Sequence, residues 1–148
     1  MFFIHDLCNL SCFLCSENLS SYFALHNISG DTLLLRLRRE LYDKETHSSP
    51  KNLSKVHFFH QNGIIVFQLK SFQLIAVMYH KGDHISSGHF VVDSWRPTMV
   101  GQTFEEYRWH HFDDDKVSIQ EIDFWSNLPE QEKEWRLSSC VFLMYRLV

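Results

Sequence analysis

The sequence predicts an α+β fold in which helices in the first part of the chain precede an antiparallel β-sheet. Two observations carry this prediction. Apolar residues repeat at helical spacing up to residue 41, and short segments rich in aromatic and β-branched residues dominate after residue 56. Helices and strands that are segregated along a chain are typical of α+β domains.

The N-terminal part carries two patterns with the period of a helix. A spacing of four between Cys15, Leu19 and Phe23 predicts a helix over residues 12–25. A second amphipathic helix is predicted after Asp31, which could cap it, because leucines recur at positions 33, 34, 37 and 41.

A polar segment over residues 43–55 follows these helices. It contains a proline and almost no apolar side chain, which is typical of a loop or linker. We therefore divide the chain into a helical N-terminal segment, residues 1–55, and a β-rich part, residues 56–148.

The β-rich part begins with a hairpin signal. Residues 56–60 and 64–67 read as strands on either side of an Asn-Gly step, the sequence most favoured in tight hairpin turns. Further short strands are predicted over 72–79, 88–93, 107–112 and 139–146.

Composition and charge exclude several classes of protein. Hydrophobic residues make up 45% of the chain and charged residues 22%, as in soluble globular domains. With 14 basic and 18 acidic residues the formal charge is −4, so no basic surface is expected for nucleic acid. No apolar run is long enough to cross a membrane, and the chain start lacks the positive region of a secretion signal. Three cysteines crowd near the N-terminus rather than forming a disulfide framework, so we expect a reducing compartment, cytoplasmic or nuclear.

Two short motifs contain the candidate catalytic residues: Gly88-His89, and the acidic residues that begin at Asp113. Gly88 precedes His89 at the start of a predicted strand, where a residue without a Cβ atom lets the backbone turn tightly. Asp113 ends the next strand and could accept a hydrogen bond from Nδ1 of His89, which would leave Nε2 free as a base. An isolated histidine and aspartate, however, more often belong to a solvated surface.

The order of several motifs over residues 72–148 resembles the closing half of the catalytic domain of ubiquitin-specific cysteine proteases. The motifs are His80-Lys81-Gly82 at a strand end, Ser87-Gly88-His89-Phe90, Trp109-His110-His111-Phe112-Asp113-Asp114 and the final strand with Met144-Tyr145-Arg146. The resemblance implies a papain-like fold, of which these strands would form part of the palm. It also implies ubiquitin or ubiquitinated proteins as partners and hydrolysis of ubiquitin from its conjugates.

The resemblance implies a role for each matched residue. His89 would be the general base and Asp113 the acid that orients it, and Asp114 would assist or substitute. Gly88 and Trp109 would contact the substrate.

The nucleophile implied by the resemblance is a cysteine at the start of a helix. The best local candidate is Cys12, because the free N–H groups of a helix N-terminus lower the pKa of a thiol. The glycine of the family's cysteine box is absent, Cys15 replaces its asparagine, and the chain before His89 is short. Two hypotheses therefore stay open. The chain is an active isopeptidase whose nucleophile is Cys12, or it is a truncated, inactive fragment that acts as a ubiquitin-binding or regulatory module.

Cys12 and Cys15 also have the spacing of zinc ligands, with Cys8 and His5 nearby. No second pair of this kind follows in the sequence. We expect no metal and no cofactor.

Overall fold

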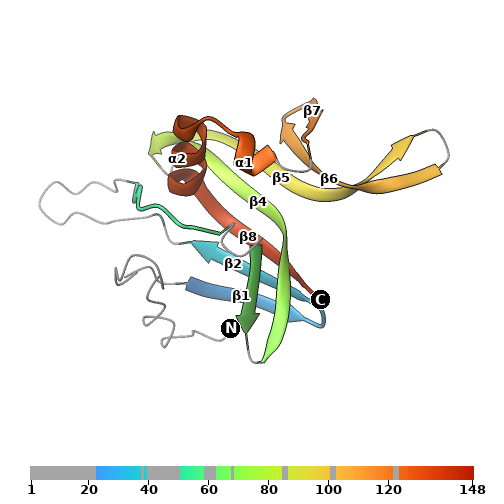
Figure 1. Cartoon of the computed structure of the whole chain (residues 1–148). Helices are drawn as coiled ribbons and strands as arrows, with labels where there is room; N and C mark the ends of the chain where they lie inside the picture. Colours follow the sequence, from blue (N-terminus) through green and yellow to red (C-terminus); the bar gives the residue numbers. More distant parts are fainter. Residues whose placement is uncertain are drawn as a thin grey trace, which may run out of the picture.

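The computed structural model describes residues 23–37, 39, 51–58, 63–67, 69–84, 87–100, 103–121 and 124–148, and most of them belong to one β-sheet (Figure 1). Two helices accompany the sheet. The strands are β1 (Phe23–Ser29), β2 (Thr32–Leu37), β3 (Ile64–Phe67), β4 (Lys70–His84), β5 (Ser87–Val100), β6 (Thr103–Asp113), β7 (Lys116–Ile119) and β8 (Cys140–Leu147). The helices are α1 (Phe124–Asn127) and α2 (Glu130–Ser139).

The sheet is antiparallel throughout the described residues. Its strand order is β1-β2-β8-β4-β5-β6-β7, and β3 pairs with the beginning of β4 off this path. Figure 1 shows α1 and α2 on the same side of the sheet, close to β4, β5 and β8, while β5 and β6 run out as a long two-stranded arm. None of the described helices is long and apolar enough to cross a membrane.

The core is rich in aromatic side chains that join the sheet to the helices. Tyr79 of β4 packs against Trp135 of α2 with ring centroids 5.4 Å apart. Phe58, from the segment before β3, lies 5.4 Å from Trp125 of α1. The buried hydrophobic residues are Leu33, Leu37, Val56, Phe58, Phe72, Leu74, Val77, Tyr79, Val91, Trp109, Phe124, Cys140, Leu143 and Tyr145.

The predicted second helix is wrong, because its leucines form strand β2. Leu33 and Leu37 are buried and Leu35 is partly buried against the core, so every second residue faces inward. Pairing with β8, which lies beside β2, overrides the helical spacing of the leucines. Residues 23–25, the end of the predicted first helix, belong to β1, and the rest of that helix lies outside the described residues.

The N-terminal segment contributes to the same sheet as the end of the chain, because β2 pairs with both β1 and β8. A turn at Gly30, with φ of +64°, joins β1 to β2. The division of the chain at residue 55 therefore stays a prediction about ancestry rather than a boundary of the sheet.

The predicted hairpin between residues 56–60 and 64–67 is also wrong. The predicted strand over residues 64–67 is confirmed as β3, but residues 56–58 form no strand, and β3 pairs with β4 instead. The physical reason is that Val56 and Phe58 are buried and that the backbone N–H of Val56 donates to the carbonyl of Leu137, 3.0 Å away. The segment thus packs along the end of α2 and has no free edge for a hairpin partner.

The four later strands are confirmed, and the structure extends them. Residues 72–79, 88–93, 107–112 and 139–146 fall largely within β4, β5, β6 and β8. Between the predicted strands 88–93 and 107–112, residues 94–100 lengthen β5 and residues 103–106 lengthen β6, which gives the arm of Figure 1. Strand β7 and both helices were not predicted.

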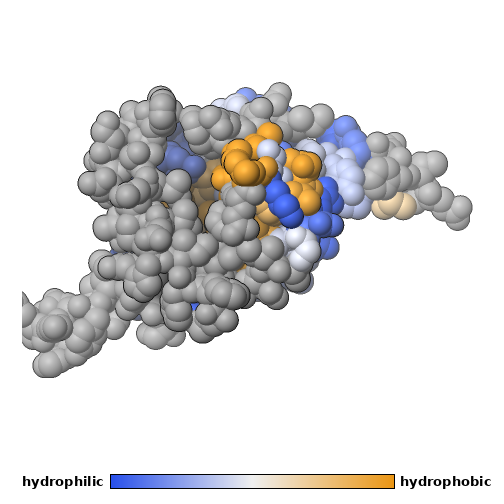
Figure 2. Space-filling view, turned by 90° about the horizontal axis from the view of Figure 1, so that it is seen from below, coloured by the Kyte–Doolittle hydropathy of each residue, from blue (hydrophilic) through white to orange (hydrophobic). Residues whose placement is uncertain are grey.

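Some apolar side chains remain outside the core. Leu69 lies in the turn between β3 and β4 with φ of +62° and is fully exposed, and Val66 of β3 is largely exposed. Figure 2 shows hydrophobic residues gathered on the side of the molecule seen from below, next to hydrophilic ones. The described part of the chain therefore presents apolar surface to its surroundings.

Candidate active site

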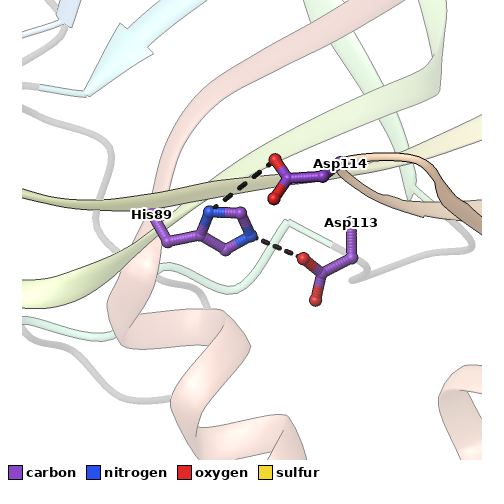
Figure 3. A group of neighbouring side chains, drawn as sticks. All are labelled: His89, Asp113 and Asp114. Carbon is purple, nitrogen blue, oxygen red and sulfur yellow. Dashed lines mark hydrogen bonds and ion pairs between the residues drawn. The ribbon is translucent and has the colours of Figure 1, made fainter.

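The structure brings His89 and Asp113 into direct contact. His89 lies near the start of β5, and Asp113 ends the neighbouring strand β6. Nε2 of His89 is 2.5 Å from Oδ1 of Asp113, and the side chains are 39% and 36% exposed (Figure 3). The structure thus places this acid beside this histidine, as the sequence suggests, and their catalytic roles stay predictions.

The nitrogen that makes the contact differs from the prediction. Asp113 binds Nε2 rather than Nδ1, while Nδ1 faces Oδ1 of Asp114 at 3.9 Å. Figure 3 shows the two carboxylates on different sides of the imidazole. Asp113 lies beyond the tip of the ring, so it meets the far nitrogen. An ionised Asp113 only accepts, so Nε2 carries the hydrogen and Nδ1 is the nitrogen left to take up a proton.

Asp113 has a second partner, the Lys81 ammonium, which sequence reasoning missed. Nζ of Lys81 lies 3.3 Å from Oδ2 of Asp113. The hydrogen bond from His89, helped by the Lys81 ammonium, outweighs burial and holds the pKa of Asp113 below its ordinary value of 3.8. Asp113 therefore stays ionised at neutral pH, as an orienting acid must.

Asp114 occupies the turn that follows Asp113. Its φ is +53°, and the turn closes the hairpin between β6 and β7, in which Asp113 is opposite Lys116. An aspartate tolerates this left-handed backbone better than most residues. Its side chain is 78% exposed, and the 3.9 Å separation from the imidazole exceeds a hydrogen bond.

Gly88 is required by the packing beneath the histidine. Its φ is +154°, and a Cβ atom there would lie 2.4 Å from both Nε2 of His80 and the carbonyl oxygen of Lys81. The ring of His80 also packs against Phe90, with centroids 4.7 Å apart. These close approaches explain why a residue without a Cβ atom precedes His89, whereas the contact of Gly88 with substrate stays a prediction.

Trp109 lies in the core rather than on the surface of the site. It is 7% exposed and its ring lies 5.7 Å from Trp95 and 5.9 Å from Phe124. This packing joins β5, β6 and α1. A role for Trp109 in binding substrate stays a prediction that its burial does not favour.

A second histidine–aspartate pair lies on the same strands and was missed. Nδ1 of His111 on β6 is 2.7 Å from Oδ1 of Asp93 on β5. The hydroxyl of Tyr79 donates to Oδ2 of Asp93 at 2.8 Å, and Arg136 of α2 binds the same oxygen. Asp93 is fully buried, so it is a charge held by three partners inside the core.

Lys51, from the predicted polar loop, and Arg39, just before it, bind backbone carbonyls of distant segments. Nζ of Lys51 donates to the carbonyls of His80 at 2.5 Å and of Gly82 at 3.1 Å. Burial, and then the charge of Arg39, lower the pKa of Lys51. The Arg39 guanidinium binds carbonyls on both sides, including that of Cys140 at 2.8 Å. Nothing in the local sequence distinguishes these two from solvated cations.

Cys140, the cysteine within the described residues, is not suited to attack a substrate. It is fully buried, and burial raises its pKa to about 11 despite the nearby Arg39 charge. Cys12, the predicted nucleophile, lies outside the described residues, as does most of the helix predicted over residues 12–25. The pairing of Cys12 with His89 therefore stays a prediction.

His89, Asp113 and Asp114 each have one atom that could bind a metal ion, and these three atoms lie within 4.8 Å of one another. The Lys81 ammonium beside Asp113 opposes a further cation at this place. A shallow hollow of about 300 Å³ lies elsewhere, between β7 and α1, and it contains none of the predicted site residues.

A comparison with protein families identifies the chain. A family model described as ubiquitin carboxyl-terminal hydrolase matches residues 16–145, which include His89 and Asp113. The match begins after Cys12 and extends the resemblance, predicted for residues 72–148, toward the N-terminus. A search of curated proteins finds no match. The chain belongs to the ubiquitin carboxyl-terminal hydrolase family.

Proposed function

We propose that this chain is a cysteine protease of the ubiquitin-specific type that releases ubiquitin from protein conjugates. The observation that supports it best is the contact of His89 with an ionised Asp113 inside a family match that covers most of the chain. A half-exposed imidazole fixed by a carboxylate is the arrangement that general-base catalysis needs.

In the proposed reaction Cys12 supplies the thiolate. His89 takes the thiol proton, and the sulfur attacks the carbonyl carbon of ubiquitin's C-terminal glycine. The bond from that carbon to the lysine nitrogen breaks as His89 gives the proton to the leaving amine. Water, deprotonated by His89, then hydrolyses the thioester and restores the thiol. Asp113 holds the ring throughout.

Ubiquitin carrying a C-terminal electrophile tests this proposal. We expect a covalent adduct on Cys12 that Cys12→Ala and His89→Ala abolish, whereas Cys8→Ala and Cys15→Ala serve as matched thiol controls and retain it. Asp113→Asn should slow adduct formation by ~100-fold or more, because a misoriented base loses most of its contribution. The absence of any adduct on the wild-type chain would refute the proposal.

A second candidate is a ubiquitin-binding module without turnover. Its specific support is that both imidazole nitrogens face carboxylate oxygens, at 2.5 Å from Asp113 and 3.9 Å from Asp114. This candidate predicts that ubiquitin binds equally well to the wild type and to Cys12→Ala, with no release of a fluorogenic group from ubiquitin's C-terminus. Measured turnover that depends on His89 would exclude it.

A further inference from the structure

We propose that Lys81 is a positioning residue that selects Asp113, rather than its neighbour Asp114, as the acid that orients His89. The inference rests on the proposed function, because it assigns a role within the same site. It follows from how two carboxylates and one ammonium surround one imidazole.

Lys81 is placed for this role by the register of the sheet. It lies on β4 directly opposite His89 on β5, with Asp113 on the far side at the end of β6. Oδ1 of Asp113 takes the hydrogen bond from His89, while Oδ2 lies 3.3 Å from the Lys81 ammonium. Both carboxylate oxygens thus have a partner, which fixes the plane of the carboxylate toward the ring.

The ammonium is itself held in place by helix α2. Nζ of Lys81 lies 5.3 Å from the ring centroid of Trp135, within the range of a cation–π contact. Trp135 packs in turn on Tyr79, two residues before Lys81 on β4. The Lys81 side chain is 40% exposed, but its contact with the Trp135 ring restricts where its ammonium can lie. Lys81 therefore presents its charge at a defined place.

Asp114 lies farther from the imidazole of His89 than Asp113 does. Its carboxylate lies 3.9 Å from Nδ1 of His89, on a turn and mostly exposed to solvent. Two like charges beside one ring repel each other, and a cation that pairs with one of them stabilises that one next to the ring. Lys81 pairs with Asp113, which explains why the tighter contact to His89 belongs to Asp113.

A double-mutant cycle tests whether Lys81 acts through Asp113. Lys81→Met keeps a long apolar chain against Trp135 but removes the charge, and we expect it to slow adduct formation with the ubiquitin electrophile by ~fivefold, the upper range for a half-exposed ion pair. Lys81→Arg should stay within about twofold of the wild type, because it keeps the charge. Lys116→Met is the matched control, since Lys116 is exposed on β7 opposite Asp113 in the hairpin.

In the Asp113→Asn background, Lys81→Met should have almost no further effect, because its target is gone. Equal effects of Lys81→Met with and without Asp113 would overturn the inference, and so would a loss equally large in Lys116→Met.

A second measurement does not depend on catalysis. The carboxyl carbon of Asp113 can be titrated by NMR, and Lys81→Met should move its midpoint upward toward 3.8, because the lysine lowers the pKa of Asp113 in the folded protein. If the wild type forms no adduct, the proposed function fails while this shift still reports the Lys81 contact. An unchanged midpoint would overturn the inference by itself.

Discussion

The buried charge of Asp93 provides the most demanding test of the fold. Asp93 is 0% exposed and is bound by Tyr79, His111 and Arg136, and the side chain of Arg136 is itself 6% exposed. Replacing Arg136 by methionine keeps a long chain between Tyr79 and Trp135 but leaves a buried carboxylate without its strongest partner. Breaking one side of a buried ion pair typically destabilises a protein by ~3–5 kcal/mol.

We expect Arg136→Met to lower the free energy of unfolding by about 3 kcal/mol, at the lower end of that range because two hydrogen bonds to Asp93 remain. Asp93→Asn should lower it by about 2–3 kcal/mol, because the arginine then keeps only Glu132, at 3.0 Å, as its acid. The double variant should lose less than the sum of the two, since it removes both charges together.

Urea unfolding followed by tryptophan fluorescence measures these free energies, and Trp135 next to Arg136 supplies a local signal. Arg108→Met is the matched control, because the Arg108–Glu106 pair is half-exposed and should contribute less than ~1 kcal/mol. If Arg136→Met lowers the stability no more than Arg108→Met, or if the two single losses simply add, the buried ion pair is not what holds α2 to β5 and β6.

Three further outcomes follow from the same structure. Gly88→Ala should destabilise the chain by ~2 kcal/mol more than Gly30→Ala. Both glycines have positive φ, but of the two only Gly88 has neighbouring atoms where a Cβ atom would lie. Thermal unfolding compares the two variants, and equal losses of stability would contradict this packing. Lys51→Met should lower the free energy of unfolding by ~2 kcal/mol, because the carbonyls of His80 and Gly82 lose their hydrogen-bond donor. Lys55→Met is the control and should lower it by less than ~1 kcal/mol, because the pair of Lys55 with Glu134 is exposed. Cys140, with a pKa of about 11, should resist iodoacetamide at pH 8 in the folded chain and react once urea unfolds it; peptide mapping by mass spectrometry separates it from Cys8, Cys12 and Cys15, and rapid labelling of Cys140 itself in the native chain would refute its burial.

Four of the strands after residue 70, β4, β5, β6 and β8, were predictable because their signal is local. Aromatic and β-branched residues alternate in β4, β5, β6 and β8 with a period that a short window of sequence contains. Strand β2 was not predictable in this way, since its leucines fit both a helix and a strand. Contact with β8, more than 100 residues later in the chain, decides between them.

Helix α2 was missed for a related reason. Glu130–Ser139 carries few apolar residues, so its periodicity is weak. The helix is held instead by Trp135, which packs on Tyr79, and by Arg136, which binds Asp93. Aromatic and charged contacts of this kind depend on partners from distant strands and leave little trace in the helix's own sequence.

The residues of the candidate site also differ in whether a local sequence signal predicts them. His89, Gly88 and Asp113 were found because each belongs to a short motif, and the pairing of β5 with β6 brings those motifs together. Lys81 lies in one of these motifs, yet its contact with Asp113 depends on the register of β4 against β5. Lys51 acts on backbone carbonyls, which carry no sequence signal at all.

Two histidine–aspartate pairs on the same pair of strands show why environment, rather than pair geometry, assigns a catalytic role. His111 meets Asp93 through Nδ1, as in a serine-protease triad, but it is only 18% exposed and its acid is paired with Arg136 inside the core. His89 meets Asp113 through Nε2, yet it is 39% exposed, and its acid lies at the surface beside the Lys81 ammonium. A base must reach a substrate, so access favours His89, while the buried pair fixes the two strands on which His89 and Asp113 stand.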